Sequence, residues 1–322
     1  MERPARLPLA LLPTPLEESV RLREAWGGPR ILVKRDDLTG FELSGNKVRK
    51  LEYHLAAARA AGADAVVTCG ALQSNHCRAT ALAAARLGLA CRLVIRTPDG
   101  EPPARVAGNH LLHRLAGAGI RYVTPAEYDD RDHVLAEEAA ALRGAWVVPE
   151  GASDALGMWG FVAAAEELVG QLGDREIDAV WHASSSAGTT AGLLVGFALA
   201  GRELPVVACS VGDPADELSA RIDELVGASR DRWGTPMPSR AAEVTDAHVG
   251  EGYGATTGDD LALQGEATRL TGMLFDPTYT GKALAGLARE IAGGRFGPED
   301  TVVFWHTGGG FAAFASDWPG IG

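Results

Sequence analysis

Residues 43–62 read LSGNKVRKLEYHLAAARAAG, and this stretch decides the fold. It follows a short apolar run at residues 31–35 that predicts a buried β-strand. The small and polar residues that come next predict a turn and a helix start, with Ser44 or Asn46 as the N-cap. The Ala- and Leu-rich pattern then predicts a helix over residues 46–61. A strand that leads through a polar turn into a helix is the repeating unit of a parallel α/β sheet.

The same order of strand, turn and helix recurs along the chain. Apolar, β-branched runs predict further strands at residues 65–69, 91–95, 120–123, 145–148, 178–183, 205–211 and 301–306. Ala- and Leu-rich patterns predict further helices at residues 75–87, 103–117, 131–143, 154–171, 190–200, 214–227, 258–271 and 281–293. We therefore expect an α/β fold in which helices cover both faces of mostly parallel sheets. No Pro-, Gly- or Ser-rich linker divides the chain, so a chain with two domains would cross between them more than once.

Length and composition exclude several classes of protein. The chain has 322 residues, which suggests two domains at about 150 residues each. A hydrophobic content of 46% with 22% charged residues excludes disorder. The net charge of −12 argues against nucleic acid and anionic membranes as partners, and no apolar run is long enough to span a bilayer. The four cysteines show no zinc-binding spacing, and we expect no metal site and a reducing, cytoplasmic location.

Lysine is rare in this chain, because only four of the 30 basic residues are lysines. A lysine is therefore more informative here than in most sequences, and only a primary amine can form a covalent bond with a carbonyl carbon and release water. Lys47 falls in the first turn of a predicted helix, where the helix dipole lowers the pKa of an amine. Two interpretations remain open: a reactive amine, or a solvated lysine beside Arg49 and Lys50.

The turn after the predicted strand at 65–69 carries Gln73, Ser74, Asn75 and His76 at the opening of a helix. Backbone N–H groups and hydroxyls at a helix N-terminus form an anion site that suits a carboxylate. Capping by Ser74 or Asn75 is the simpler alternative, and it explains only one of the four residues. A lone His76 is more often a hydrogen-bonded structural residue than a catalytic one.

A second polar turn has the composition of a phosphate-binding loop. It follows the predicted strand at 178–183 and consists of Ser184, Ser185, Ser186, Ala187, Gly188, Thr189 and Thr190. Small residues with free N–H groups ahead of a helix suit a phosphate monoester, although a Ser-rich surface loop is the alternative. The loop lacks the lysine of a P-loop and the pattern of a dinucleotide-binding turn. A reactive lysine and a phosphate loop together suggest one cofactor, pyridoxal 5′-phosphate, which has both an aldehyde and a phosphate.

Three segments near the C-terminus combine glycines with hydroxyl side chains: EGYG at 251–254, DPTYTGK at 276–282 and HTGGG at 306–310. Tyr253 and Tyr279 in these segments suit either proton transfer or the anchoring of loops. Thr280 and Thr307 suit either a hydrogen bond to a ring nitrogen or helix capping. The pattern alone leaves these alternatives open.

Taken together, these motifs resemble the 1-aminocyclopropane-1-carboxylate (ACC) deaminase / D-cysteine desulfhydrase family. The matching segments, in chain order, are KRDDLTG, SGNKVRKLEY, QSNH, SSAGTTAGL, EGYG, DPTYTGKALAGL and HTGGG. The resemblance implies the type II, tryptophan synthase β-like pyridoxal-phosphate fold, with two three-layer α/β/α domains. It also implies a large domain of residues 1–49 plus 159–322, a small domain of residues 50–158, an active site in the cleft between them, and a homodimer.

The resemblance also implies roles for individual residues. Lys47 would form the covalent link to the cofactor and later move the Cα proton of the substrate. Ser74 and the N–H groups of Asn75 and His76 would hold the substrate carboxylate, and the Asn75 side chain would hydrogen-bond the ring hydroxyl of the cofactor. The other cofactor contacts that it implies are Asn46, Ser185, Ser186, Ala187, Gly188, Thr189, Thr190, Thr280 and Thr307. The residues that it places beside the substrate are Tyr253 and Tyr279.

Two positions bear on the reaction. ACC deaminases carry Glu and Leu where this chain has Thr280 and Thr307, which is the pattern of the D-cysteine desulfhydrases. A hydroxyl at the ring nitrogen gives a weaker electron sink than a carboxylate, and that suffices when a good leaving group sits on Cβ. We therefore expect α,β-elimination from a small amino acid, with D-cysteine giving pyruvate, hydrogen sulfide and ammonia. The alternatives are a cysteate sulfo-lyase, an ACC deaminase and a β-replacement transferase.

The sequence departs from the family pattern near the expected pocket. Ser44 and Ser185 stand where glycine is usual, Thr256 and Thr257 replace a Pro-Asn pair, and Ala79 stands where glutamine is common. We expect these changes to affect the choice of substrate rather than the chemistry.

Overall fold

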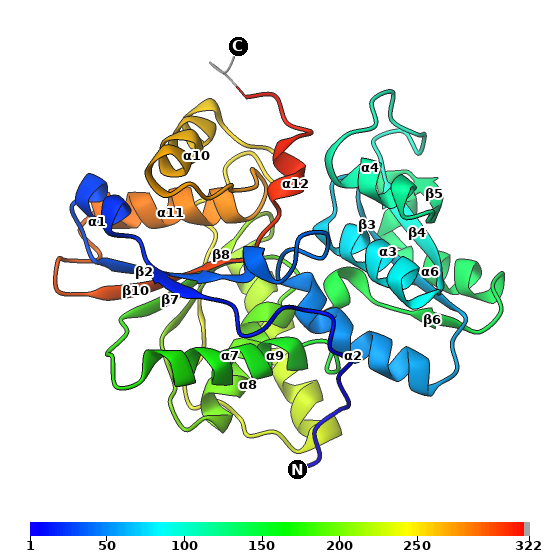
Figure 1. Ribbon diagram of the computed structural model, residues 1–322, viewed down its shortest axis with the longest axis horizontal. Helices are drawn as coiled ribbons and strands as arrows, with labels where there is room; N and C mark the ends of the chain where they lie inside the picture. The colour runs from blue at the N-terminus through cyan, green and yellow to red at the C-terminus, as the bar shows by residue number, and fades with distance from the viewer. Residues whose placement is uncertain (319–322) are drawn as a thin grey trace.

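The structure, a computed structural model, describes residues 1–318. It contains two β-sheets that lie side by side (Figure 1). The larger sheet has six strands in the order β1-β2-β10-β7-β8-β9, and the smaller has four in the order β5-β4-β3-β6. Every strand pair is parallel except β1–β2, which is antiparallel. The prediction of an α/β fold with mostly parallel sheets is confirmed.

The strands of the larger sheet are β1 (Leu16–Glu18), β2 (Arg30–Arg35), β7 (Ala179–Ser184), β8 (Val206–Ser210), β9 (Glu243–Thr245) and β10 (Thr301–His306). Those of the smaller sheet are β3 (Ala65–Ala71), β4 (Ala90–Arg96), β5 (Gly119–Val123) and β6 (Ala145–Val147). All eight predicted strands are present. The sequence reading missed β1 and β9, which are three-residue edge strands too short to show a periodic pattern.

The α-helices are α1 (Val20–Trp26), α2 (Lys47–Ala60), α3 (Asn75–Leu87), α4 (Gly108–Leu115), α5 (Pro125–Asp129), α6 (Arg131–Ala140), α7 (Trp159–Leu172), α8 (Gly188–Leu199), α9 (Ala215–Trp233), α10 (Gly258–Thr271), α11 (Thr280–Ala292) and α12 (Gly310–Ala313). Short 3₁₀ helices lie at Asp36–Leu38 and Glu150–Ala152. The helices α1, α5 and α12 were not predicted, because each has seven residues or fewer.

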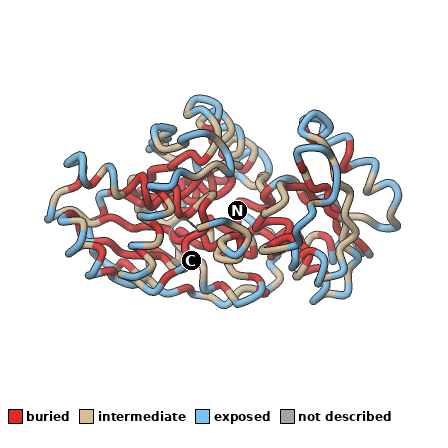
Figure 2. Tube along the Cα trace, turned by 90° about the horizontal axis from the view of Figure 1, so that it is seen from above, coloured by how far each residue is buried: buried red, intermediate tan, exposed pale blue. Residues whose placement is uncertain are grey.

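Helices cover both faces of the larger sheet, with α7, α8 and α9 on one face and α1, α10 and α11 on the other (Figure 1). Alternate residues of its strands therefore belong to two separate apolar clusters, as in Val303 and Phe304 of β10. Seen from above, buried residues run along the strands of both halves of the molecule, and exposed residues follow the loops (Figure 2). The strands β3 to β6 come from one continuous part of the chain. The predicted domain boundaries at residues 50 and 158 stay a prediction.

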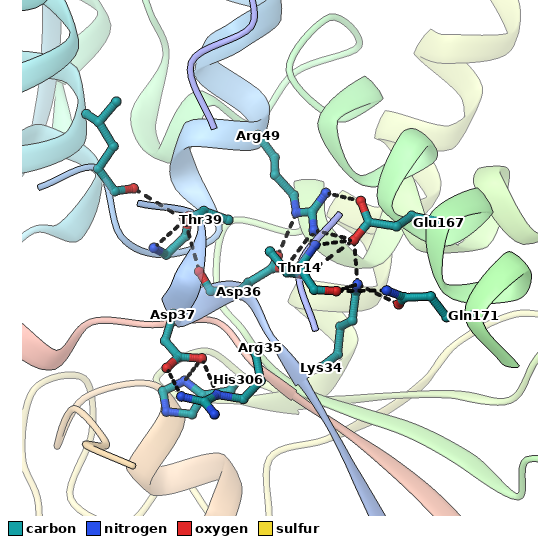
Figure 3. A network of polar contacts seen from close by, with 12 residues as sticks. Thr14, Lys34, Arg35, Asp36, Asp37, Thr39, Arg49, Glu167, Gln171 and His306 are labelled. Atoms are coloured by element: carbon teal, nitrogen blue, oxygen red, sulfur yellow. Dashed lines mark hydrogen bonds and ion pairs between the residues drawn. The ribbon is translucent and has the colours of Figure 1, made fainter. Parts of the chain in front are cut away.

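A buried ionic network fixes α2 against the larger sheet (Figure 3). The Arg49 guanidinium donates to both oxygens of Asp36 at 2.8 Å and to both oxygens of Glu167 at 3.0 Å. Lys34 of β2 is fully buried and also pairs with Glu167. Burial raises the pKa of Glu167, but the hydrogen bonds and charges of Arg49 and Lys34 outweigh this and hold it at about 2. Because Arg49 lies two residues after Lys47, the network sets the position of the helix that carries this lysine.

Candidate active site

A cavity lies where the carboxyl ends of strands from both sheets meet the N-termini of α2, α3 and α8. It encloses about 650 Å³ of space that atoms do not fill, including its opening to solvent. Ligands of open α/β sheets bind at this end of the strands. The predicted site residues that line it are Asn46, Lys47, Ser74, Asn75, His76, Ser185, Ser186, Ala187, Thr189, Tyr253, Tyr279 and Thr307. The predicted residues outside the lining are Gly188, Thr190 and Thr280.

Lys47 is the first residue of α2 and lines the cavity. Within residues 1–318 its amine has neither a hydrogen-bond partner nor an ion pair. Burial lowers the pKa of Lys47 to about 8, and the charge of Glu150 partly opposes this effect. The expected lowering is present, and burial is its largest cause. An amine with this pKa is available as a nucleophile near neutral pH.

The turn before α2 has a different structure from the predicted cap. Asn46 occupies the N-cap position, but its side chain donates to Thr189 Oγ1 at 3.3 Å and makes no capping bond. The hydroxyl of Ser44 donates to the Asp37 carbonyl at 2.9 Å. Of the two predicted N-cap residues, Asn46 is therefore the one that holds this position, although its side chain makes no capping bond. Both groups are used to hold the turn in place, and the Asn46 N–H donates to the Thr307 carbonyl at 3.0 Å.

At the start of α3, Ser74 is the N-cap, and its Oγ accepts from the Cys77 N–H at 3.1 Å. Its hydroxyl proton remains available to the cavity. Asn75 Oδ1 accepts from Asn109 Nδ2 at 2.8 Å, so the Asn75 amide presents its Nδ2 donor elsewhere. Asn109 is fully buried and also donates to the Gln73 carbonyl at 2.8 Å. Ser74 therefore caps the helix, and the turn still offers the Ser74 hydroxyl and the Asn75 amide nitrogen as hydrogen-bond donors.

Hydrogen bonding assigns the tautomer of His76. The Thr68 hydroxyl donates to the Val148 carbonyl at 2.7 Å and lies 2.7 Å from His76 Nε2. Because the single proton of Thr68 is already used, Nε2 must carry a proton and donate it. Burial, with the charges of Lys47 and Lys50, holds the pKa of His76 well below its usual value. His76 is therefore neutral, and its Nδ1 has no partner among the described residues.

The Ser- and Gly-rich loop leads from β7 directly into α8, whose first residue is Gly188. Ala187 adopts a positive φ of 62° at the end of this loop. A Cβ atom at Gly188 would lie 2.7 Å from Ser153 Oγ and 2.9 Å from Lys50 Nζ, so a larger residue would displace these two side chains. Thr190 points away from the cavity and meets Ser184 Oγ at 2.9 Å.

Lys50 is a site residue for which the sequence reading left a structural role open. Its amine is fully buried and donates to Ser153 Oγ at 2.8 Å and to the Gly151 carbonyl at 3.3 Å. No carboxylate lies within ion-pair distance of it in residues 1–318. Burial, followed by the charge of Lys47, moves the pKa of Lys50 well below its usual value. A buried amine without a counter-ion beside the start of α8 is suited to an anion.

Tyr253 and Tyr279 meet across the opening of the cavity. Their hydroxyls lie 2.6 Å apart and their rings are perpendicular, with centroids 5.8 Å apart. The outer part of Tyr253 is exposed, but burial around its hydroxyl raises the pKa of Tyr253 to about 12. Burial raises the pKa of Tyr279 well above its usual value. Both hydroxyls are therefore protonated at neutral pH, and the pair can pass a proton between them.

A third lysine holds the loop that carries Tyr253. Lys282 of α11 is buried and donates to the Val249 carbonyl at 2.8 Å and to the Gly252 carbonyl. Both carbonyls belong to the loop that precedes Tyr253. Lys282 thereby fixes the position of this tyrosine over the cavity.

The two threonines differ in their surroundings. Thr307 lines the cavity, and its hydroxyl has no hydrogen-bond partner within the described part of the chain. Thr280 is fully buried, donates to Asp276 Oδ1 at 2.7 Å and accepts from the Asp276 N–H at 2.9 Å. The structure therefore leaves the Thr307 hydroxyl free for a ligand, whereas the Thr280 proton is already used. Asp276, which the sequence reading did not identify, is the buried partner of Thr280.

The cavity lining also contains Ser184, the first residue of the predicted phosphate-binding loop, and residues that sequence reasoning missed, namely Gly70, Ala71, Glu150, Gly151 and Ala183. Their position directly after predicted strands was the only signal available. Within residues 1–318, no group of three or more His, Cys, Asp and Glu side chains is placed to hold a metal ion. No helix in the same range has the length and apolar character needed to cross a membrane.

A family model described as pyridoxal-phosphate dependent enzyme matches residues 7–308. The chain belongs to this family. It is 38% identical to a putative ACC deaminase of Thermotoga maritima, over 96% of this chain and 98% of that protein. It is also 38% identical to D-cysteine desulfhydrase of Yersinia pestis, over 96% of this chain and 95% of that protein. A bifunctional D-cysteine desulfhydrase/ACC deaminase of Arabidopsis thaliana is 36% identical over 94% of this chain and 77% of that protein.

Solved structures agree with this assignment. The crystal structure of an ACC deaminase homologue superposes with a TM-score of 0.87 at 32% identity, covering 97% of this chain and 94% of that one. A fungal L-serine ammonia-lyase from Rhizomucor miehei shares the fold, with a TM-score of 0.64 at 19% identity. The predicted resemblance to the ACC deaminase / D-cysteine desulfhydrase family is confirmed. The cofactor of this pyridoxal-phosphate dependent enzyme is therefore pyridoxal 5′-phosphate.

The residues present fit this cofactor. The unpartnered amine of Lys47 matches the aldehyde, and the uncompensated amine of Lys50 beside the start of α8 matches the phosphate. Gly188 provides space that any side chain would fill. Asn75, with its oxygen already bonded to Asn109, offers a donor that matches the ring hydroxyl.

Proposed function

We propose that the protein catalyses α,β-elimination from a small β-substituted amino acid, with D-cysteine giving pyruvate, hydrogen sulfide and ammonia. The observation that carries this proposal is the arrangement of one cavity. It places the free amine of Lys47 with the tyrosine pair and the open donors of the α3 N-terminus. The names of relatives that match over nearly the whole chain support the same reaction class.

When bound, pyridoxal phosphate supplies an aldehyde for covalent attachment and a ring that withdraws electrons from the substrate Cα. The amine of Lys47 would hold the covalent link until the substrate amine displaces it, and the freed Nζ would then take the Cα proton. The Ser74 hydroxyl and the N–H groups of Asn75 and His76 bind the substrate carboxylate at the N-terminus of α3. The hydroxyls of Tyr253 and Tyr279 deliver a proton to the departing sulfur.

The phosphate is proposed to lie at the N-terminus of α8, held by the loop from Ser185 to Thr190, with Lys50 supplying a positive charge. The ring nitrogen is proposed to meet the free hydroxyl of Thr307, with Thr280 held behind it by Asp276. A hydroxyl there leaves the ring a moderate electron sink. This supports loss of a good leaving group from Cβ over opening of a cyclopropane ring.

The purified protein with pyridoxal phosphate tests this proposal. Release of pyruvate and sulfide from D-cysteine, with little from L-cysteine, is the expected result. Lys47→Ala is expected to abolish both this activity and the absorption band of the covalently linked cofactor. Faster release of 2-oxobutanoate from 1-aminocyclopropane-1-carboxylate would instead establish the deaminase. Diversion of the product by an added thiol would establish a β-replacement transferase, and preference for cysteate a sulfo-lyase.

We further propose a homodimer in the cytoplasm. Exposed apolar side chains gather around a surface cavity of about 580 Å³, which is lined by Leu11, Leu38, Phe41, Leu274 and Phe314 among others. An apolar surface of this kind suits a second copy of the chain. The four cysteines are unpaired, as expected in a reducing compartment. Light scattering is expected to give a dimer, and Phe41→Glu is expected to shift it to the monomer, because Phe41 is 81% exposed.

A further inference from the structure

Glu150 has no part in the chemistry proposed above, yet it lines the same cavity. Among the described residues of the lining, Lys47 and Glu150 are the two that carry a charge, since His76 is neutral. Glu150 opens a short 3₁₀ helix after β6. Both of its carboxylate oxygens are held in place. The Tyr128 hydroxyl donates to Oε1 at 2.8 Å, and Arg131 Nε lies 3.2 Å from Oε2.

The charge of Glu150 reaches the groups that surround the substrate. Burial lowers the pKa of Lys47, and the charge of Glu150 opposes this shift. Burial raises the pKa of Tyr253 and of Tyr279, and the charge of Glu150 adds to both shifts. All three residues line the cavity, so the carboxylate acts on the lysine and on the tyrosine pair.

Next to this site, a wider cavity that includes Glu150 and Tyr253 encloses about 1420 Å³ of space that atoms do not fill, including its opening to solvent. Its charged lining consists of Arg96, Asp129, Arg131, Asp132, Glu150, Asp213, Glu217 and Arg221, so carboxylates outnumber guanidinium groups by two. Arg221 pairs with Asp213 at 2.6 Å, and Arg96 lies against the rings of Tyr128 and Tyr253. This cavity therefore carries net negative charge, and Glu150 is the carboxylate that it shares with the lining of the site.

We propose that Glu150 sets the substrate class of this site. Neutral or cationic groups on the substrate Cβ are accepted, and anionic groups such as a sulfonate or a carboxylate are rejected. The inference rests on the proposed function, because it assumes an α-amino acid bound with its Cβ toward the cavity mouth. Its physical basis is the cost of bringing a second negative charge into a cavity beside a carboxylate that Tyr128 and Arg131 hold at the lining, with 44% of the Glu150 side chain exposed to solvent.

Asparagine and aspartate provide a matched test, since they have the same shape and differ in the charge on their side chains. Their dissociation constants are measured on the cofactor-loaded enzyme from the change in cofactor absorption, with both enantiomers of each. The wild-type protein is expected to bind asparagine at least about tenfold more tightly than aspartate. The repulsion between Glu150 and a negatively charged substrate side chain is expected to raise the dissociation constant by about three- to tenfold. Glu150→Gln, which keeps the acceptor for Tyr128, is expected to reduce the preference by that factor.

Two further variants test whether the preference for asparagine over aspartate changes with the charge near Glu150. Arg131→Gln removes the cation that partly neutralises Glu150, and it is expected to increase the preference for asparagine. Asp132→Asn removes a carboxylate that lines the outer cavity alone, and it is expected to change the preference by less than about twofold. Melting temperatures of all variants show whether each is folded.

An unchanged preference in Glu150→Gln would overturn the inference, as would an equal shift in Asp132→Asn. It would also be overturned if neither ligand altered the cofactor absorption of the wild-type protein at millimolar concentration. A different result would refute the proposed function, namely that the enzyme releases no pyruvate from D-cysteine or from β-chloroalanine. The binding of asparagine and aspartate still reports on Glu150 in that case.

Discussion

Asn109 determines which end of the Asn75 amide faces the cofactor site. Its Nδ2 donates to Asn75 Oδ1 at 2.8 Å in a fully buried position. Asn109→Asp replaces this donor with a negatively charged acceptor of the same shape. The Asn75 amide is then expected to rotate by about 180° and donate to the new carboxylate, so that it presents its oxygen to the cavity instead of its nitrogen.

The magnitude follows from the strength of the new bond. A hydrogen bond to a charged group contributes about 1.5–3 kcal/mol, so the original orientation would retain about 1–10% of the population. The affinity for pyridoxal phosphate falls by the same fraction, which is a loss of about 10- to 100-fold. Asn109→Ala leaves both orientations open, and it is expected to cost only about two- to threefold in affinity.

The assay is a titration of each apoprotein with cofactor, followed by tryptophan fluorescence, with Asn75→Ala as the second variant of a double-mutant cycle. In the Asn75→Ala background, Asn109→Asp is expected to have almost no further effect on cofactor affinity. If Asn109→Asp lowered the cofactor affinity by the same factor of about 10 to 100 in the wild-type protein and in Asn75→Ala, Asn109 would act through the general stability of the turn. The orientation argument would then be refuted.

Three other outcomes follow from buried charges. Lys50→Met removes an amine that lacks a counter-ion, so we expect an apoprotein of equal or higher melting temperature that binds cofactor about 10- to 100-fold more weakly. The pKa of Glu167 is lowered, so its contribution of about 2–3 kcal/mol is present above about pH 4.5 and is lost as pH falls toward 2. Glu167→Gln is expected to flatten this acid dependence in urea unfolding. Thr280→Glu places a second carboxylate against buried Asp276, and we expect it to lower stability by about 2 kcal/mol or more, whereas Thr280→Ser does not.

The sequence was informative about features that depend on neighbours along the chain. Strand patterns gave the sheets, and polar turns after these strands gave the cavity, because parallel strands place their carboxyl ends together. Twelve of the predicted site residues line that cavity, and all of them except Tyr253 and Tyr279 lie in turns that follow predicted strands. The roles assigned to individual residues stay predictions.

The remaining features depend on contacts between distant parts of the chain. Asn109 lies 34 residues from the Asn75 side chain that it orients. Glu150 reaches the cavity only because β6 pairs with β3 in the smaller sheet. No local pattern reports such pairings, and the sequence of a polar turn does not reveal which of its hydroxyls is already bonded. Thr280 illustrates this point, since its sequence position resembles that of Thr307 and its surroundings do not.

The rarity of lysine in the sequence was informative about burial. All four lysines are removed from bulk solvent: Lys34, Lys50 and Lys282 are buried, and Lys47 lines the cavity. At Lys50 the buried ammonium donates to Ser153 Oγ at 2.8 Å and to the Gly151 carbonyl at 3.3 Å. At Lys282 a compact ammonium donates to two carbonyls of one tight loop. Where arginine serves nearly every exposed position, the few lysines that remain mark the places where a small amine is required.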